Sequence, residues 1–398
     1  MPEPTPTPIP PTPTPPARPW WQGLIPTNWR ELVGWLAVML VSTSLNRWVL
    51  PPDKQLPVPD APIPIFVPPP DGWHPPTEAD TREAFEKLRT PRWRNTEAGR
   101  DGPVGDADAP VWRLAFKARG KTIPTRDQSQ IGSCVSFGYA AAGEYTMGVQ
   151  AALAKVRQDL PDMCQEAIYG GSRVEVNGGR VPFNGDGSTG AWGAKWLEST
   201  GGYLARGVYG SFDLTAYDVP RCRAWGNSGV PNELEPECKK HQARCTLVGS
   251  TADAKAALAN GYAIAVCSGV GFDSNKNQEG KPTRDSEGFL KAQGSWGHCM
   301  AIIGYRADRP GFLILNSWGP GWVTGPKGKF DDIPDGSFWA AETDVRRMLS
   351  EQDSYAVANA DGFKKRKLEP SDWIIQNTRP APRISLLRGF DHAFALAH

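Results

Sequence analysis

The chain has 398 residues, enough for two or three domains, and its 44 basic and 43 acidic residues nearly cancel in charge. Such a balance gives no long-range attraction for a nucleic acid, so we expect no nucleic-acid partner. A short basic run at residues 364–367 is interpreted as solvated surface.

The front of the chain is rich in proline. Residues 1–19 contain ten prolines, and residues 51–76 contain eleven. Segments of this composition cannot form a core and sample extended polyproline II conformations. We therefore predict a proline-rich arm over residues 1–30 and a proline-rich linker over residues 51–107.

An apolar segment at residues 31–50 separates these two regions. Its charge-free run, residues 32–46, is shorter than the roughly 20 residues of a comfortable membrane span. Trp29 and Trp48 bracket the run, however, and tryptophan prefers the membrane interface. Three interpretations compete: a membrane anchor, a signal sequence, and a helix that lies on protein or on the membrane surface. The start lacks the basic region of a signal peptide, so we expect a membrane-anchored protein, and otherwise a secreted or soluble one.

Further along, the pattern from Glu78 to Arg89 predicts an amphipathic helix.

Cys134 is the first candidate functional residue. It precedes an alanine-rich run, residues 135–145, that predicts a helix with the thiol in its first turn. There the helix dipole favours a thiolate, typically by about 0.3–1 kcal/mol, and the thiolate is the nucleophilic form. Taken alone, Cys134 could equally be a small buried core residue.

His298 and Asn316 supply the groups that would activate such a thiol. His298 opens an apolar segment ending at Tyr305 that predicts a buried strand, and a second apolar run at residues 312–315 precedes Asn316. Two such runs predict an antiparallel hairpin that places Asn316 near His298. The imidazole can then take the thiol proton, and the Asn316 oxygen can accept the second ring N–H. Trp318 can shield that hydrogen bond from water.

Gln128 lies six residues before Cys134 and can donate an amide N–H, together with the Cys134 backbone N–H, to a developing oxyanion. The stretch from Gln128 to Cys134 keeps the spacing of the nucleophile motif of papain-family cysteine peptidases. Residues 316–322 resemble that family's Asn-Ser-Trp-Gly-x-Gly-Trp motif, and residues 254–266 resemble its helix-then-strand step. Over roughly residues 108–358 the chain is therefore similar to this family.

The resemblance implies an α+β, two-lobed, papain-like fold, with a helical lobe, an antiparallel β-rich lobe and the active site between them. It implies a peptidase domain at residues 108–358, expected to be monomeric, that hydrolyses a protein or peptide substrate through an acyl-thioester on Cys134. No metal or organic cofactor is needed. The family is commonly made with a propeptide, and within residues 51–107 we consider residues 77–107 as the pro-segment that would cover the cleft.

The resemblance also implies a substrate cleft in which Gly187 and Ser188 lie where the family's paired glycines hold the substrate backbone, with Trp318 nearby. An ordinary glycine-rich loop is the alternative. Three departures from the family pattern bear on cleft shape and substrate preference, and none removes a catalytic group. Val135 replaces the tryptophan after the nucleophile, Ile131 replaces a disulfide cysteine, and Ser129 replaces a glycine of the oxyanion loop.

Seven cysteines are an odd number, which fits one catalytic thiol and up to three disulfide bonds. Three of them lie in a polar segment where papain relatives often carry a disulfide: Cys222, Cys238 and Cys245. Cys164 is a candidate partner there. A metal site built from Cys238, His241 and Cys245 is the alternative, although the pattern lacks a fourth ligand and a finger spacing.

Two rival functions stay open beside the peptidase. One is an amidase or transpeptidase on the same scaffold, which product analysis separates, since hydrolysis leaves free new termini. The other is a catalytically silent domain with a membrane-tethered role in binding or assembly. The presence of all four chemical groups favours the peptidase. Beyond the domain we predict a tail, residues 359–398, that packs to about residue 375 and frays after it.

Overall fold

The structure is a computed structural model that describes residues 65–155, 160–366 and 368. The chain divides into two units, residues 1–63 and residues 64–398. The predicted proline-rich arm and the apolar segment 31–50 fall in the first unit and lie outside the described residues. Within the part of the chain that is described, no helix is long and apolar enough to cross a membrane.

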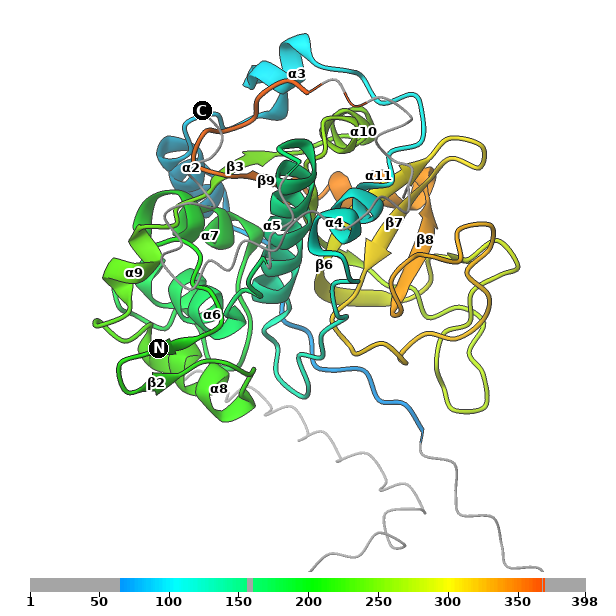
Figure 1. Ribbon diagram of the computed structural model, residues 1–398. Coiled ribbons are helices and arrows are strands. Elements are labelled where there is room, and N and C mark those ends of the chain that lie inside the picture. Colours follow the sequence, from blue (N-terminus) through cyan, green and yellow to red (C-terminus); the bar gives the residue numbers. More distant parts are fainter. Residues whose placement is uncertain (1–64, 156–159, 367, 369–398) are drawn as a thin grey trace, which may run out of the picture. The chain divides into compact units, whose positions relative to one another are not determined.

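The second unit combines helices with one large sheet (Figure 1). Helix α5 stands between a group of helices on one side and strands β6, β7 and β8 on the other. The helices are α2 (Glu78–Lys87), η3 (Trp93–Asn95), α3 (Glu97–Asp101), α4 (Val111–Arg119), α5 (Cys134–Leu153), α6 (Gln165–Arg173), η4 (Glu175–Asn177), α7 (Gly190–Lys195), η5 (Trp196–Thr200), α8 (Val219–Ser228), α9 (Glu235–Lys239), α10 (Thr251–Ala259) and α11 (Glu342–Leu349).

The large sheet has seven strands in the order β3-β9-β4-β6-β7-β8-β5. Neighbouring strands are antiparallel, except that β5 pairs parallel with β8. A separate antiparallel pair joins β1 and β2. The strands are β1 (Val208–Tyr209), β2 (Phe212–Asp213), β3 (Arg244–Leu247), β4 (Ile264–Val270), β5 (Phe289–Leu290), β6 (Ser295–Arg306), β7 (Gly311–Leu315), β8 (Ser337–Ala341) and β9 (Tyr355–Ala358). The predicted α+β class, with a helical part and a mostly antiparallel sheet, is confirmed.

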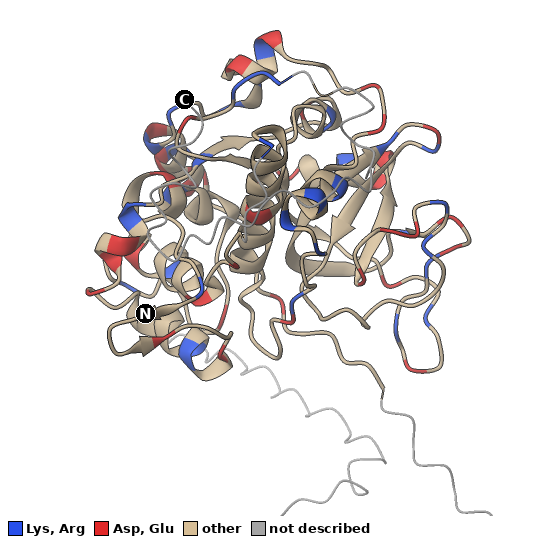
Figure 2. Ribbon diagram, viewed as in Figure 1, with Lys and Arg blue, Asp and Glu red and all other residues tan. Residues whose placement is uncertain are grey.

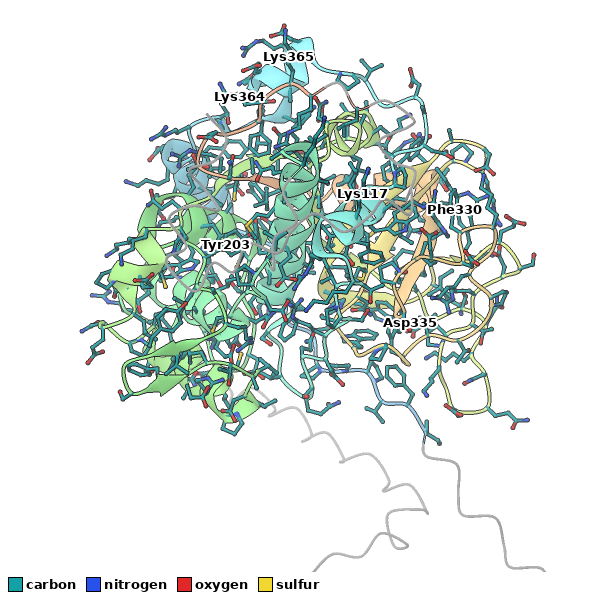
Figure 3. The ribbon with its side chains drawn as sticks, in the orientation of Figure 1. Lys117, Tyr203, Phe330, Asp335, Lys364 and Lys365 are labelled. Carbon is teal, nitrogen blue, oxygen red and sulfur yellow. The ribbon has the colours of Figure 1, made fainter. Side chains whose placement is uncertain are left out.

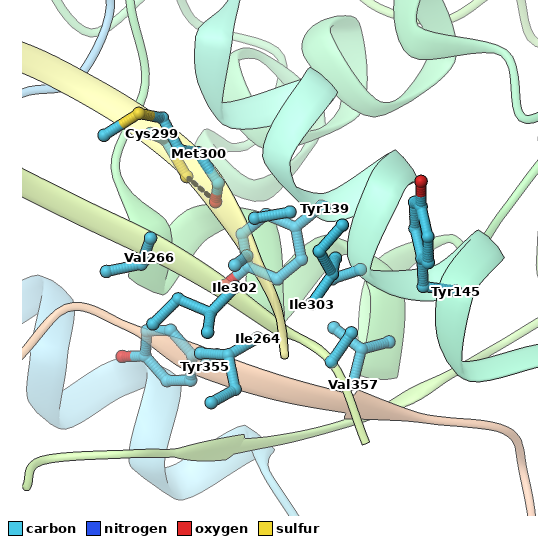
Figure 4. Packing of buried hydrophobic residues seen from close by; sticks show 14 of the residues in the cluster. Tyr139, Tyr145, Ile264, Val266, Cys299, Met300, Ile302, Ile303, Tyr355 and Val357 are labelled. Atoms are coloured by element: carbon cyan, nitrogen blue, oxygen red, sulfur yellow. Dashed lines mark hydrogen bonds between the residues drawn. The ribbon is translucent and has the colours of Figure 1, made fainter. Parts of the chain in front are cut away.

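Helix α5 is packed on both of its sides. Its tyrosines Tyr139 and Tyr145 are fully buried, and Figure 4 shows them among apolar side chains of β4, β6 and β9. The Tyr139 hydroxyl donates to the Gly190 carbonyl at 2.6 Å, and the Tyr203 hydroxyl donates to the Tyr139 carbonyl at 2.8 Å. These contacts fix the position of Cys134, the first residue of the helix.

The hairpin predicted from the two apolar runs is present. Strand β6 pairs with β7 antiparallel, with Ala301 opposite Leu315. Because β6 begins at Ser295, His298 lies inside the strand rather than at its first residue. Strand β7 ends at Leu315, so Asn316 follows it directly, as predicted.

Packed structure begins well before residue 108, where the predicted domain starts. Helix α2 begins at the predicted residue, ends two residues before the predicted end, and has a capping box at its N-terminus. Trp93 is 2% exposed and packs edge-on against Phe363, with ring centroids 5.7 Å apart. Large apolar side chains on both flanks of residues 108–358 therefore join the core. In the predicted tail, the residues after 368 lie outside the described part.

Acidic and basic side chains are interspersed over the described surface (Figure 2). Of the basic run at residues 364–367, Lys364 and Lys365 are exposed (Figure 3), and Lys364 pairs with Glu97 at 3.4 Å. Arg366 instead lies over the Tyr262 ring, 4.2 Å from its centroid. The run is therefore solvated surface only in part.

Candidate active site

Cys134 occupies the N-terminal end of α5. Its N–H has no acceptor within the helix, and the helix terminus places partial positive charge beside the thiol. The loop before it turns at Ser129, whose φ of 57° is a left-handed conformation that glycine adopts more readily. The Ser129 N–H donates to the Asp127 carboxylate at 2.7 Å, which stabilises the turn without a glycine.

His298 and Asn316 lie together, as the predicted hairpin implies. His298 Nε2 and Asn316 Oδ1 are 2.6 Å apart. Because an amide oxygen only accepts hydrogen bonds, Nε2 carries the proton, and the acceptor nitrogen of a neutral His298 is Nδ1. Trp318 is buried, and its ring centroid lies 4.7 Å from that of His298. The indole therefore covers the imidazole.

The thiol of Cys134 lies against the strand that carries the histidine. The backbone N–H of Cys299, the residue after His298, donates to Cys134 Sγ at 3.3 Å. Burial raises the pKa of the Cys134 thiol well above its ordinary value, and the neighbouring Cys299 and Asp71 raise it further. Burial also lowers the pKa of His298 to about 4. Burial thus favours the uncharged form of each group.

Gln128 is fully buried and held from both sides of the site. Its side-chain oxygen accepts from the Ser317 hydroxyl at 2.7 Å, and its amide nitrogen donates to the Ile131 carbonyl at 2.8 Å. One amide hydrogen is thus used within the loop, and the second is the one that the predicted oxyanion contact requires. The structure brings Gln128, Cys134, His298 and Asn316 into one region.

Residues 71–74, which we call the cleft segment, run across this region. The Asp71 carboxylate accepts the Gly297 N–H at 3.0 Å. The N–H groups of Gly72 and Trp73 both donate to the Gly297 carbonyl, each at 2.8 Å. Since Gly297 directly precedes His298, the cleft segment is bound to the strand that carries the imidazole.

The cleft segment also lies on the loop that carries the nucleophile. Gly72 is in direct contact with Gly132, and a Cβ on Gly72 would stand 2.5 Å from the Gly132 carbonyl. In Figure 1 this segment, drawn in blue, passes below the lower end of α5. With the segment in this position, Cys134 is 0% exposed and His298 is 2% exposed.

Ser188 pairs with the main chain of the cleft segment. Its N–H donates to the Gly72 carbonyl, and its carbonyl accepts the His74 N–H, each at 3.0 Å. Trp73 and Ser188 thereby form a parallel bridge. Gly187 has a φ of 119°, and a Cβ there would lie 2.4 Å from the His74 ring. Both predicted cleft residues therefore face an extended main chain.

Residues 77–107, which we considered as the pro-segment, follow the cleft segment in the chain. The residues in the cleft lie within 51–107 but upstream of 77–107, because α2 packs against α7 instead. The Trp192 indole N–H donates to Asp80 at 3.0 Å, and Lys195 pairs with Glu83 at 2.5 Å. Helix α2 thus anchors the downstream end of the cleft segment.

Trp73 and Asp353 form a contact that sequence reasoning missed. The Trp73 indole N–H donates to Asp353 Oδ2 at 2.7 Å. The same carboxylate accepts the backbone N–H groups of Gly190 and Ala191, at 2.6 and 2.7 Å. Burial raises the pKa of Asp353 to about 7, although these three donors act to lower it. In the sequence, Trp73 lies between proline-rich stretches, and nothing near Asp353 indicates a hydrogen bond to a distant indole.

Replacing Asp353 with asparagine is expected to change the pH dependence of stability. The carboxyl pKa of about 7 in the folded chain, against an ordinary 3.8, means that the folded state binds this proton more tightly than the unfolded state. The contribution of this proton to the free energy of unfolding is fully present below about pH 4. It is lost as pH rises through about 7, and the loss amounts to up to about 4 kcal/mol. Urea unfolding should show the parent losing stability relative to the variant across that window.

The stability of the variant must be compared with that of the parent at each pH, because His298 changes the stability of both proteins with pH in the opposite direction to Asp353. Its pKa, lowered from 6.5 to about 4, gives stability that is present above the first value and lost as pH falls through the second. Asp331→Asn, at an exposed position, is the matched control and should differ from the parent by a constant amount. A pH-independent difference for Asp353→Asn would contradict the prediction.

The cysteine pairing suggested by the sequence is wrong. All seven cysteines lie among the described residues, and all are unpaired and buried. The Cys164 thiol contacts the Glu166 carboxylate at 3.3 Å, and Cys222 packs with Ile131 and Tyr169. Cys164 and Cys222 therefore have different neighbours and do not form a disulfide with each other. Among the described residues there is also no group of three histidine, cysteine or acidic side chains that could hold a metal ion.

Neither a protein-family model nor a curated protein matches the sequence. The solved structures similar to it include cysteine proteases and their proforms. Xylellain, a cysteine protease from Xylella fastidiosa, is 17% identical with a TM-score of 0.41, over 74% of this chain and 94% of that chain. Procathepsin B S9 from Trypanosoma congolense is 13% identical with a TM-score of 0.42, over 73% and 86%. Digestive procathepsin L2 from the Tenebrio molitor larval midgut is 14% identical with a TM-score of 0.41, over 85% and 98%. The function proposed below rests on the geometry of the site.

Proposed function

We propose that this chain is a papain-like cysteine peptidase that hydrolyses peptide bonds in proteins or peptides. One observation carries the proposal: the hydrogen bond of 2.6 Å between His298 and Asn316 lies beside Cys134, whose Sγ accepts the N–H of the residue after His298. A thiol, an imidazole and an amide that orients the imidazole are the elements of an activated nucleophile.

In the proposed reaction, His298 Nδ1 takes the proton of Cys134, and the thiolate attacks the scissile carbonyl carbon. The oxyanion that forms is stabilised by the Cys134 backbone N–H and the second amide hydrogen of Gln128. The imidazolium then protonates the leaving amine, which departs and leaves an acyl-thioester. Water, deprotonated by His298, hydrolyses the thioester and regenerates the thiol.

The cleft segment must leave before this reaction can run. It forms hydrogen bonds with the Gly297 carbonyl and with the main-chain N–H and carbonyl of Ser188. An extended substrate would use the same main-chain groups. The Asp71 carboxylate of the cleft segment also acts to raise the pKa of the Cys134 thiol, which disfavours the nucleophilic thiolate. We infer that the chain as it stands is a covered form with little activity.

The decisive experiment is proteolysis by full-length chains whose cleft segment is weakened. Trp73→Ala removes the buried indole, and Gly72→Val places a side chain against the Gly132 backbone. Both are expected to cleave an unfolded protein substrate and generate new free N-termini, identified by mass spectrometry. Adding Cys134→Ala to either variant should abolish cleavage.

The products separate the peptidase from its rivals. Transfer of the acyl group to an added amine, in preference to water, would indicate a transpeptidase, and release of ammonia from side-chain amides would indicate an amidase. If neither variant cleaves protein and an epoxysuccinyl probe fails to label Cys134 in both, the chain is a catalytically silent domain. Tethering to a membrane through residues 31–50 stays a prediction.

A further inference from the structure

Two buried thiols lie behind the proposed catalytic groups and have no part in the proposed reaction. They belong to Cys267 on β4 and Cys299 on β6, and each residue is 0% exposed. Their sulfurs are 2.7 Å apart. Figure 4 shows Cys299 on its strand, in the residue after His298. The pair therefore lies directly beside the proposed active site.

Cys267 and Cys299 are placed as a pair that can form a disulfide bond. The two residues are directly opposite each other in the antiparallel register of β4 and β6. Residues so placed have Cα atoms about 4.5–5.5 Å apart, which lies within the range of about 4.4–6.8 Å found for disulfide-bonded cysteines. The strands can therefore keep their pairing when the bond forms.

Cys299 also connects this pair to the proposed nucleophile. Its backbone N–H donates to Cys134 Sγ at 3.3 Å. Its own sulfur packs on α5 at Gly138, where a Cβ would stand 2.7 Å from it. Because residues four apart share one face of a helix, this contact lies one turn from Cys134 on the same face. The three cysteines thus form a row in which Cys299 contacts both of the others.

We propose that Cys267 and Cys299 are a redox site that takes over the oxidation of Cys134 by a peroxide when the cleft segment is open. The Cys134 thiolate attacks one peroxide oxygen, and the O–O bond breaks. The leaving hydroxide takes the proton that His298 had received from the thiol and becomes water. Cys134 is now a sulfenic acid, oxidised by two electrons, and the peroxide is reduced.

Two exchange steps move this oxidation from the helix to the strands. The Cys299 sulfur attacks the Cys134 sulfur, the S–O bond breaks, and hydroxide leaves as water with the Cys299 thiol proton. The Cys267 sulfur then attacks the Cys299 sulfur, so that this bond forms and the bond from Cys299 to Cys134 breaks. Cys134 leaves as a thiolate at the end of α5, and His298 takes the Cys267 proton. Each peroxide thus converts two thiols into one disulfide, and the nucleophile is free again.

The first test treats full-length Trp73→Ala with hydrogen peroxide and maps its cysteines by mass spectrometry without a reductant. The expected product is a disulfide between Cys267 and Cys299, with Cys134 still labelled by an epoxysuccinyl probe. Gly72→Val, which opens the segment in another way, should give the same product. Adding Cys134→Ala should slow disulfide formation roughly tenfold or more, because a buried neutral thiol is a poor nucleophile. Equally fast formation without Cys134, or sulfinic acid at Cys134 with the other two thiols reduced, would overturn the proposal.

The second test stops the relay at each of its steps in the Trp73→Ala chain. Cys267→Ala should accumulate a disulfide between Cys134 and Cys299. Cys299→Ala should instead pass from sulfenic to sulfinic acid at Cys134, which the probe no longer labels. Cys222→Ala, at a buried cysteine outside the row, is the control and should give the same product as Trp73→Ala alone. The same Cys134 product in the first two variants would contradict the relay. No measurement here depends on peptide cleavage, so failure of the redox site and failure of the proposed function are distinguishable.

Discussion

Trp73→Ala in the full-length chain is expected to accelerate alkylation of Cys134 by roughly 10²- to 10³-fold. A probe reaches the buried thiol only when the cleft segment opens, so the rate follows the population of the open state. Removing a buried tryptophan typically costs about 3–5 kcal/mol, and each 1.4 kcal/mol changes a population about tenfold. Opening also removes the burial that raises the pKa of the thiol, so a larger fraction is thiolate once exposed.

The measurement is the second-order rate of labelling by an epoxysuccinyl probe, with the adduct mapped by mass spectrometry. The other cysteines are buried and serve as internal references for general unfolding. Val67→Ala is the matched control, because Val67 lies a few residues upstream and is 66% exposed. Its labelling rate should equal that of the parent.

Gly72→Val provides an independent test of the same covering role. The valine Cβ would stand 2.5 Å from the Gly132 backbone, so the segment cannot keep its position, while the Trp73 side chain is retained. Faster labelling in both variants means that the segment covers the thiol. Unchanged rates in both, with the chain still folded by circular dichroism, would show that the segment does not limit access to Cys134.

The arrangement of the proposed catalytic groups could be predicted because local patterns determine it. An alanine-rich run after Cys134 favours a helix, and two apolar runs joined by a short turn favour a hairpin. Those two elements suffice to place Asn316 beside His298 and to put Cys134 at a helix terminus. The helix, the hairpin and the α+β class were therefore predicted correctly from the sequence.

The cover of the cleft could not be predicted, because it depends on contacts between residues far apart in the chain. Asp71 and Gly297 are separated by 226 positions, and Trp73 and Asp353 by 280. The flanking prolines indicated a spacer, and the composition of a segment does not reveal which groove will bind it. The cysteine pairing failed for a similar reason, since spacing along the chain carries no information about thiol geometry.

His298→Ala, introduced into the Trp73→Ala chain, is expected to lower kcat by roughly 10²- to 10⁴-fold, the usual contribution of a positioned general base and acid. Asn316→Ala should cost less, about 10- to 100-fold, because it removes one hydrogen bond to the ring but leaves the ring in place. Hydrolysis of a peptide substrate that the Trp73→Ala chain cleaves gives both values. Asn227→Ala, an exposed amide on α8, is the control and should leave kcat unchanged.

The substitution Asn316→Asp tests whether Asn316 orients the His298 ring or only supports the local packing. The carboxylate still accepts the Nε2 proton of His298, so activity should recover toward that of the Trp73→Ala chain. Its negative charge stabilises the imidazolium, so the alkaline limb of the pH–rate profile should move to higher pH. Loss of activity in Asn316→Asp equal to that in Asn316→Ala, with no shift of the profile, would mean that Asn316 supports only the local packing. Recovery together with the shift requires that the amide oxygen acts through His298, because packing alone gives no reason for the pH of the limb to change.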